Sequence, residues 1–255
     1  MLEPAVRYAD LADKGVFITG GASGIGADLV RAFAAQGSRI LFIDLDEAAG
    51  AALQQELGAS VAFQPCDVTD TAALQGAIDR FAEQVGGLAA LINNAANDQR
   101  RAAEEADEAF WEASVAVNLK QQYFAAQAAF RRMKPAGAGS IVNFGSIAPV
   151  LGERNLSIYG ACKSAVKGMT RTLAREFGDH GVRVNAIVPG AILTEKQLKL
   201  WISPEDEARI LERQCLHRRL TGADIAPVAL FLASEASEAI TSQSIVVDGG
   251  MTGIG

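Results

Sequence analysis

The sequence predicts an α/β protein built on a doubly wound parallel sheet of seven strands with helices on both faces. Short apolar or β-branched runs alternate with alanine-rich segments of helical periodicity along nearly the whole chain. The short runs are apolar on both faces, which is typical of parallel strands buried between two helical layers. We expect strands at residues 16–19, 40–44, 61–64, 88–93, 140–144, 182–188 and 244–247.

Helices are expected between these strands at residues 24–36, 47–57, 70–85, 109–133 and 159–177. No repeat, linker or low-complexity segment divides the chain, so residues 1–255 are expected to form a single domain. The longest irregular stretch covers residues 189–204. Loops of that length in compact proteins are often functional, so we expect a substrate lid at about residues 189–215, with a plain surface loop as the alternative.

Composition excludes several classes of partner. The chain has 23 Lys and Arg against 30 Asp and Glu, a net charge of −7, and no basic run, so we expect no nucleic-acid partner. The first 13 residues carry charges and no long apolar stretch. We therefore expect neither a signal peptide nor a membrane anchor, no membrane partner, and a cytoplasmic location.

Cysteine and histidine content argues against a metal site. Cys66, Cys162 and Cys215 are odd in number and far apart, which favours reduced thiols over a disulfide framework or a zinc site. His180 and His217 are the only histidines in the sequence, and both are expected to be ordinary surface or loop residues. We therefore expect no metal and no serine-hydrolase triad.

A glycine-rich turn at residues 19–26 joins the first expected strand to the first expected helix. Glycines at such a turn let the backbone approach a pyrophosphate, and the free N–H groups of the helix N-terminus bind its charge. This favours a Rossmann-like dinucleotide site. The spacing is TGxxxGxG and differs from the common GxGxxG, and a glycine turn that binds nothing is the alternative.

Asp44 ends the second expected strand, where a carboxylate accepts hydrogen bonds from the adenosine ribose. Its charge would repel a 2′-phosphate, and neither Gly21, Ala22 nor Leu45 supplies a neutralising cation. The cofactor is therefore expected to be NAD in preference to NADP. The alternative is that Asp44 only caps the helix expected at residues 47–57.

Tyr159 and Lys163 are four residues apart on an expected helix, with Ser146 thirteen residues before the tyrosine. Residues at i and i+4 share one helix face, so the ammonium can act on the phenol. A tyrosine with an ordinary pKa near 10 needs roughly 4 kcal/mol of selective stabilisation to be a phenolate at pH 7. The pattern favours a catalytic base, and a solvated surface pair is the alternative.

The chain resembles the short-chain dehydrogenase/reductase family over about residues 14–250. The resemblance rests on the glycine turn, Asn93-Asn94-Ala95, Asn118, Ser146, Tyr159, Lys163 and Pro189-Gly190. It implies that Tyr159 transfers the proton, that Lys163 lowers the tyrosine's pKa and binds the nicotinamide ribose, and that Ser146 polarises the substrate oxygen. Asn118 resembles the helix-kinking asparagine whose main-chain carbonyl holds a water that links Lys163 to solvent.

The resemblance also implies a set of cofactor contacts. Asp67 and Val68 resemble the adenine contact, residues 93–95 the adenosine side, and residues 187–194 the nicotinamide cradle. The full set is Gly20, Ser23, Gly24, Ile25, Gly26, Asp44, Asp67, Val68, Asn94, Ala95, Tyr159, Lys163, Pro189, Ile192 and Thr194. One position departs from the family's usual NNAG: Ala96 excludes the backbone angles open only to glycine, so the loop beyond it is expected to differ.

Four segments resemble bacterial NAD-dependent sugar 1-dehydrogenases: residues 94–99, 189–197, 200–204 and 214–216. This resemblance implies oxidation of a cyclic aldose such as galactose or xylose to a lactone. Sugar hydroxyls need paired donors and acceptors, and the expected substrate residues are Asn97, Ser146, Glu153, Asn155 and Gln197, with Asp98 also bordering the site. Trp201 is expected to cover a sugar face. Solvated loop side chains, and packing of the lid for Trp201, are the alternatives.

Three functions other than sugar oxidation are alternatives. A polyol dehydrogenase would use the same residues, as would a 3-oxoacyl thioester reductase, although Asp44 and the acidic balance argue against NADPH and an acyl-carrier partner. A catalytically silent NAD-binding sensor is the alternative of a different class. The family resemblance further implies a homotetramer.

Overall fold

The computed structural model describes residues 6–194, 197 and 202–253, which contain one parallel sheet of seven strands. The strand order is β3-β2-β1-β4-β5-β6-β7. The strands are β1 (Gly15–Thr19), β2 (Arg39–Asp44), β3 (Val61–Pro65), β4 (Ala90–Asn93), β5 (Gly139–Phe144), β6 (Val182–Pro189) and β7 (Ser244–Val247). The predicted Rossmann-like fold class is confirmed, with strand bounds within two residues of those expected.

The order of the strands reverses beside β1, which pairs with β2 on one side and with β4 on the other. Thr19, the last residue of β1, is in register with both Ile43 and Asn93. In a doubly wound sheet such a reversal opens a crevice at the carboxyl ends of the strands, and ligands bind there. The fold therefore places the glycine turn after β1 beside the loop after β4.

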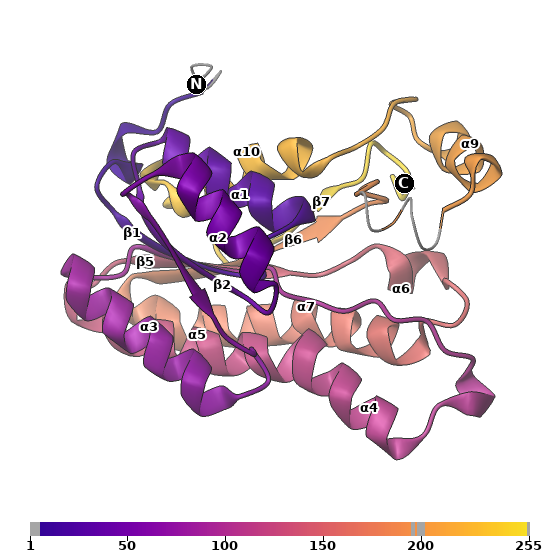
Figure 1. The fold of residues 1–255 in the computed structure, drawn as a ribbon, viewed down its shortest axis with the longest axis horizontal. Helices are drawn as coiled ribbons and strands as arrows, with labels where there is room; N and C mark the ends of the chain where they lie inside the picture. Colours follow the sequence, from indigo (N-terminus) through magenta and orange to yellow (C-terminus); the bar gives the residue numbers. More distant parts are fainter. Residues whose placement is uncertain (1–5, 195–196, 198–201, 254–255) are drawn as a thin grey trace.

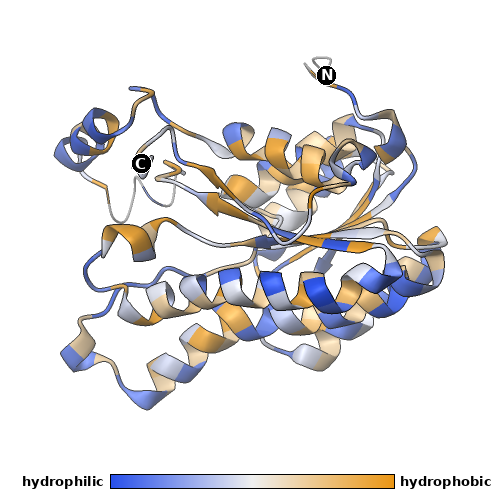
Figure 2. Ribbon diagram, turned by 180° about the vertical axis from the view of Figure 1, so that it is seen from behind, coloured by the Kyte–Doolittle hydropathy of each residue, from blue (hydrophilic) through white to orange (hydrophobic). Residues whose placement is uncertain are grey.

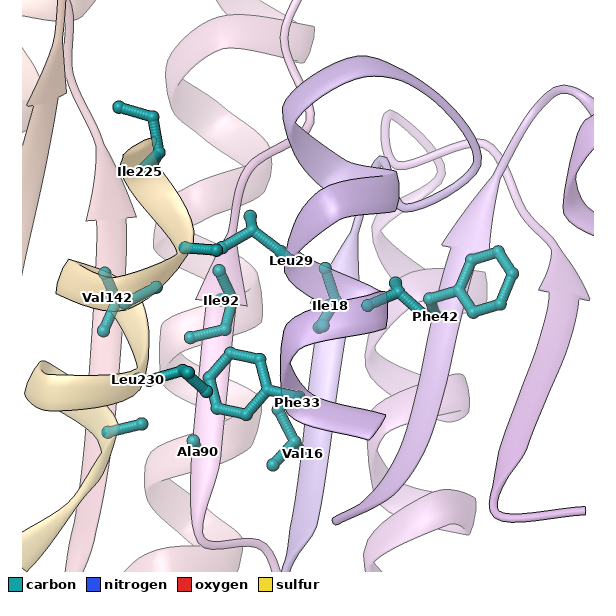
Figure 3. Packing of buried hydrophobic residues seen from close by; sticks show 14 of the residues in the cluster. Val16, Ile18, Leu29, Phe33, Phe42, Ala90, Ile92, Val142, Ile225 and Leu230 are labelled. Atoms are coloured by element: carbon teal, nitrogen blue, oxygen red, sulfur yellow. The ribbon is translucent and has the colours of Figure 1, made fainter. Parts of the chain in front are cut away.

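One face of the sheet is covered by α1 (Gly24–Ala35), α2 (Glu47–Leu57) and α10 (Gly222–Ala233) (Figure 1). Phe33 of α1 and Leu230 of α10 pack toward Val16, Ile18 and Ile92 of the sheet (Figure 3). These side chains are almost completely buried. Each contributes roughly 1.5–3 kcal/mol by leaving water, which fixes α1 and the turn before it against β1.

The opposite face is covered by α3 (Thr71–Val85), α5 (Gln121–Met133) and α7 (Ser157–Phe177) (Figure 1). Their apolar sides face the sheet, and hydrophilic residues lie along their outer surface (Figure 2). Phe130 of α5 and Phe177 of α7 stack with ring centroids 3.8 Å apart. Because α7 is held along its length, the catalytic candidates near its first turns have a rigid support.

The helix expected at residues 109–133 is interrupted. It consists of α4 (Glu108–Val115), a π-helical turn (Ala116–Lys120) and α5. Asn118 lies in this turn, and its side chain donates to the carbonyl of Ser114, where it competes with the helical backbone. The alanine-rich pattern predicts helix throughout but carries no sign of the inserted residue, which is why the sequence-based prediction of one continuous helix was wrong.

Two further helices lie at the carboxyl end of the sheet: α6 (Ala148–Leu151) and α9 (Pro204–Arg213). The α9 helix lies inside the expected lid at residues 189–215, so this part of the segment is not irregular. Its start is fixed by a capping box between Ser203 and Asp206, with Pro204 in the first turn.

None of the helices among the described residues has the length and apolar composition of a membrane-spanning segment.

Candidate active site

A cavity of about 930 Å³ opens at the carboxyl ends of the strands. Its wall contains residues from the glycine turn, the ends of β2, β4, β5 and β6, the start of α7, and α9. In Figure 1, α6 and α9 lie at the same end of the molecule, beyond the ends of β6 and β7. The cavity therefore contains both residues of the expected cofactor turn and the expected catalytic residues in its wall.

The glycine turn has no room for side chains. Gly20 has φ +66°, and a Cβ there would lie 2.7 Å from Cα of Ala95. A Cβ on Gly26 would lie 1.8 Å from the carbonyl oxygen of Gly20. The amide of Asn94 donates to this same carbonyl at 2.7 Å, which ties the loop after β4 to the turn. These contacts hold the backbone open as a cradle.

The first turn of α1 borders this cradle. Ser23, the residue before the helix, makes no side-chain capping bond, and it lines the cavity together with Ile25 and Gly26. The first N–H groups of a helix have no intrahelical partner and attract anions. Gly24 does not line the cavity. Its φ of +53° lies in the left-handed region that favours glycine, so it shapes the backbone of the turn. The arrangement fits a pyrophosphate.

Asp44 faces the cavity from the end of β2. Oδ2 accepts from the N–H of Ala22 at 2.9 Å, and Oδ1 accepts from Leu45 at 2.7 Å and Asp46 at 3.2 Å. The capping residue of α2 is Asp46, whose side chain accepts from Ala49. The alternative in which Asp44 caps this helix is therefore excluded, and its carboxylate is oriented by backbone donors beside the cradle.

The wall beyond Asp44 is apolar. Leu45, Cys66 and Val68 line it. Asp67 does not: its exposed Oδ1 accepts from the backbone N–H and the hydroxyl of Thr69, both at 2.8 Å. The predicted contact Val68 thus reaches the cavity, the predicted contact Asp67 does not, and the apolar Leu45 and Cys66 were not predicted as contacts.

Two of the three residues expected on the adenosine side, at the end of β4 and in the loop after it, reach the cavity. Asn94 and Ala95 line the cavity, whereas Asn93 is buried and its amide donates to Asn143 and to the carbonyl of Gln122. Ala96 lines the cavity, and its φ is not positive. The substitution of alanine for the usual glycine therefore fits the local backbone.

Ser146, Tyr159 and Lys163 meet in this cavity. Ser146 forms a side-chain hydrogen bond with Tyr159, and its Oγ also accepts from the N–H of Ala148 at 3.0 Å. The buried ammonium of Lys163 donates to the carbonyl of Phe144 at 2.9 Å and lies 5.6 Å from the centroid of the Tyr159 ring. The spacing of the three residues in the sequence thus becomes one side-chain cluster.

Burial dominates the electrostatics of this cluster. It raises the pKa of Tyr159 to about 12, against a lowering by the hydrogen bond from Ser146, and the nearby Asp98 charge raises it further. Burial also lowers the pKa of Lys163 to about 8. The Tyr159 shift is opposite in direction to the one expected from Lys163 alone. A further positive charge at this site would be needed to make the phenolate near neutral pH.

Asn118 lies behind the catalytic cluster and outside the cavity wall. Its Nδ2 donates to the carbonyls of Asn97 and Ser114, and its Oδ1 accepts from the N–H of Asn97. Its own main-chain carbonyl accepts from Nε2 of Gln122 at 3.2 Å. The residue therefore fixes the loop after β4, and a protein donor already contacts the carbonyl for which a water was expected.

The segment after β6 forms the next part of the wall. Pro189, Ile192 and Thr194 all line the cavity, as expected for the nicotinamide side. The methyl group of Thr194 would lie 3.2 Å from a Cβ on Gly24, so this segment packs over the start of α1. The cradle and the post-β6 segment therefore enclose the same space from two sides.

The expected substrate residues divide into two groups. Asn97, Ser146, Glu153 and Gln197 line the cavity, and Nε2 of Gln197 donates to Asp98 at 2.6 Å. Asn155 does not line it; the residue is exposed with φ +63°, and its carbonyl accepts from Arg101. Trp201 lies outside the described residues.

Sequence reasoning missed the contribution of α9. This helix and the residue before its cap give the cavity five wall residues: Ile202, Asp206, Arg209, Ile210 and Arg213. A signal was present, because Ser203-Pro204 followed by Asp206 is a typical helix start. Within the residues that the structure describes, no group of three or more His, Cys, Asp or Glu side chains is placed to hold a metal ion.

The glycine cradle, the adjacent carboxylate of Asp44 and the cluster of Ser146, Tyr159 and Lys163 in one cavity are typical of nucleotide-dependent oxidoreductases with a Rossmann-like fold. A family model described as Enoyl-(Acyl carrier protein) reductase matches residues 20–252. The chain belongs to the short-chain dehydrogenase/reductase family. It is therefore an oxidoreductase acting on CH–OH groups with a nicotinamide nucleotide.

Relatives of this chain are named for sugars and polyols. It is 42% identical to the "Probable galactose dehydrogenase GalD" of Rhizobium meliloti strain 1021, over 98% of this chain and all of that one. It is 39% identical to a D-xylose 1-dehydrogenase of Caulobacter vibrioides, covering 95% and 97%. It is 42% identical to a galactitol 2-dehydrogenase of Cereibacter sphaeroides, covering 92% and 93%.

A solved structure also matches closely. The crystal structure of a protein from Sinorhizobium meliloti 1021, assigned as a short-chain alcohol dehydrogenase, superposes with a TM-score of 0.90 at 35% sequence identity. The alignment covers 96% of this chain and 99% of the other. The likeness extends over the whole sheet and both helical layers.

Proposed function

We propose that this enzyme oxidises a cyclic aldose at C1 with NAD and forms an aldonolactone and NADH. The carrying observation is that Ser146, Tyr159 and Lys163 share one cavity with the glycine cradle and Asp44. A reacting carbon held against the hydroxyls of Ser146 and Tyr159 therefore lies in the same space as a dinucleotide bound from the cradle. The relatives named for galactose and xylose support an aldose.

Cofactor binding follows from the cavity wall. The cradle and the first turn of α1 would bind the pyrophosphate, Asp44 the adenosine ribose, and the apolar residues beyond it the adenine. Asp44 would accept hydrogen bonds from both ribose hydroxyls and repel a 2′-phosphate. The described cations of the wall lie on other elements, namely Arg100, Lys163, Arg209 and Arg213. We therefore propose NAD in preference to NADP.

The proton transfer uses the side-chain cluster. When bound, NAD supplies the hydride acceptor and a positive ring near Tyr159. Ser146 and Tyr159 hold the anomeric hydroxyl between them, and the phenolate of Tyr159 takes its proton as the C1–H bond breaks and C1=O forms. Lys163 adds positive charge beside the phenol. The pKa of the partly buried Tyr159, raised to about 12, keeps its hydroxyl protonated in the absence of a further positive charge.

The sugar hydroxyls would be bound at the other end of the cavity. Asn97, Glu153 and the hydrogen-bonded pair Gln197–Asp98 offer both donors and acceptors. A site built to pair a hydroxyl rejects analogues that lack it. In this proposal residues 189–215 act as the substrate lid, with α9 as its outer wall.

A polyol dehydrogenase is the second candidate, and the relative named galactitol 2-dehydrogenase favours it. The acidic Asp44 argues against a 3-oxoacyl thioester reductase that uses NADPH, and the Ser146, Tyr159 and Lys163 cluster argues against a silent sensor. We further propose a single-domain, homotetrameric enzyme in the cytoplasm. The three free cysteines support a reducing compartment.

Replacing Tyr159 by phenylalanine tests this function. Tyr159→Phe is expected to lower kcat at least about 1000-fold, because a general base is removed, and to leave the dissociation constant for NAD within about threefold. The matched control is Tyr123→Phe, a half-exposed tyrosine on α5. Both are measured by NADH absorbance and by NAD titration. Full turnover in Tyr159→Phe would contradict the assignment.

A further inference from the structure

The peptide of Phe144, at the end of β5, lies beside the catalytic lysine. Its carbonyl accepts from Nζ of Lys163 at 2.9 Å and from Nε2 of Gln122 at 3.3 Å. Its N–H donates to Oε1 of the same glutamine, also at 3.3 Å. A peptide N–H can only donate and a peptide carbonyl can only accept, so the glutamine oxygen must face the N–H and the glutamine nitrogen must face the carbonyl, which fixes the orientation of the amide.

The glutamine amide takes the place of a missing strand. The last residue of β4, Asn93, pairs with Asn143, so Phe144 lies one residue beyond the β4 ladder. A buried peptide without hydrogen-bond partners would be destabilising. The amide of Gln122 supplies one acceptor and one donor to Phe144, as the next residue of a paired strand would. This holds the carbonyl that Lys163 contacts.

The same amide also reaches the π-helical turn. Nε2 of Gln122 donates to the carbonyl of Asn118 at 3.2 Å. The backbone carbonyl of Gln122 in turn accepts from Nδ2 of Asn93. Gln122 and Asn118 are fully buried, and every polar atom of the Gln122 side chain is hydrogen-bonded. One side chain therefore joins the Phe144 carbonyl that Lys163 contacts to the Asn118 carbonyl in the π-helical turn.

We propose that Gln122 is a positioning residue for the proton transfer: its amide clamps the Phe144 carbonyl that holds the Lys163 ammonium beside Tyr159. This inference rests on the proposed role of Tyr159 as the base. Without the clamp the carbonyl is no longer held, the ammonium moves relative to the phenol, and the phenolate loses part of its stabilising charge. Gln122, Phe144 and Lys163 thus affect the proton transfer through the pKa of Tyr159.

The other groups that face the tyrosine and the lysine stay unchanged in this test. Ser146 follows β5, Asp98 lies in the loop after β4, and Cys162 precedes the lysine on α7. Among the described residues, the hydrogen bonds of the Gln122 side chain go to Asn118 and Phe144, and the hydrogen bond at its carbonyl comes from Asn93. A change in the ionisation of Tyr159 after replacement of Gln122 therefore reports the clamp.

The test follows the ionisation of Tyr159 directly. The chain has three tyrosines, so ultraviolet difference spectra against the same protein carrying Tyr159→Phe isolate its phenolate, with saturating dinucleotide. In Gln122→Met the ionisation is expected to shift upward by about one pH unit, as for loss of a nearby charge, and kcat to fall about tenfold with an unchanged KM for the dinucleotide. Gln122→Glu keeps the acceptor but loses the donors, and it is expected to shift in the same direction.

Gln75→Met is the matched control, because the Gln75 amide also donates to a carbonyl of α5, that of Phe124, on the far side of that helix. It is expected to lower the unfolding temperature without moving the Tyr159 ionisation. Folded Gln122 variants with wild-type ionisation of Tyr159 would overturn the proposal. If Gln122→Met does not fold, the Gln122→Glu titration decides alone. A wild-type protein that oxidises no alcohol would refute the proposed function, and the spectral titration would still judge the clamp.

Discussion

The two ends of the cavity are built by different means. At the cofactor end the backbone forms the wall: glycines without room for a Cβ, the amide of Asn94 on the carbonyl of Gly20, and an aspartate held by three N–H groups. At the substrate end side chains form the wall, and they come from the loop after β4, from α6 and its following loop, and from α9.

This difference separates what the enzyme binds from what it selects. A wall made of backbone tolerates few substitutions, because any Cβ collides with main-chain atoms. A wall made of side chains on loops and a short helix can change its hydrogen-bonding pattern without disturbing the sheet. The cofactor end is therefore expected to fail sharply when altered, and the substrate end to change gradually.

The sharpest failure is expected at Gly26. In Gly26→Ala the added Cβ would lie 1.8 Å from the Gly20 carbonyl oxygen, so the turn must move. Overpacking of this kind costs a few kcal/mol, and we expect the dissociation constant for NAD to rise at least about 100-fold. Titration by protein fluorescence measures it. Gly168→Ala, on the exposed side of α7 with nothing near its Cβ, is the control and should bind NAD normally.

Where the two ends meet, the buried ammonium of Lys163 makes stability depend on pH. Its pKa of about 8 in the folded protein lies below its ordinary value of 10.5. Between these values the unfolded chain binds more protons, so stability rises with pH. We expect the contribution of Lys163 to the free energy of unfolding, taken as the difference from Lys163→Met, to rise by about 2–3 kcal/mol from pH 8 to pH 10; the raised pKa values of the Cys66 and Cys162 thiols act in the opposite direction in all variants.

Urea unfolding without cofactor at each pH measures this rise. It should be absent in Lys163→Met and present in Lys167→Met, an exposed lysine on the same helix. The same slope in all three proteins would mean that the lysine is not buried as the structure has it. The window ends at pH 10 because the raised pKa of Tyr159 makes stability fall with pH above that point.

A smaller effect is expected at Asp44. Asp44→Asn keeps one of the two oxygens that accept from neighbouring N–H groups and removes the charge that repels a 2′-phosphate. The NAD to NADP ratio of kcat/KM is expected to fall about 30-fold, as for loss of a charged hydrogen bond. Asp46→Asn removes a carboxylate two residues away and should leave the ratio unchanged. An unchanged ratio in Asp44→Asn would remove the ribose role.

The smallest effect is expected at the substrate end. Gln197→Met removes the 2.6 Å hydrogen bond to Asp98, and the KM for sugar is expected to rise about tenfold with the KM for NAD unchanged. Asn155→Gly is the control: glycine tolerates the positive φ, and the side chain lies outside the cavity wall. An equal rise in Asn155→Gly would show that the wall is drawn wrongly.

The sequence predicted well those parts that local rules govern. Strand bounds follow from short apolar runs, and the glycine turn and Asp44 follow from what a phosphate and a ribose need. The family resemblance pointed to a helix kink at Asn118, but the alanine-rich pattern predicted one continuous helix, because the π-helical turn depends on Asn118 bonding across space to Asn97. The contribution of α9 to the cavity wall was not predicted, because Ser203 and Pro204 were interpreted as the end of a loop and not as the start of a helix.

Side-chain hydrogen bonds that no motif encodes account for the remaining differences. Asp67 was expected at the adenine, but its side chain is engaged locally by Thr69. Gln122 carries no motif, and its position between Phe144 and Asn118 depends on where β4 stops and where the helix gains a residue. Such roles arise from tertiary packing, which spacing along one chain does not reveal.

The central claim is that a backbone-built end selects NAD and a side-chain-built end presents a cyclic aldose to Tyr159. The most direct measurement is NADH formation over a panel of aldoses, polyols and hydroxy acids, each with NAD and with NADP. The account predicts the highest kcat/KM for an aldose with NAD, and a lactone as the product. No turnover of any aldose, with polyols oxidised instead, would contradict it.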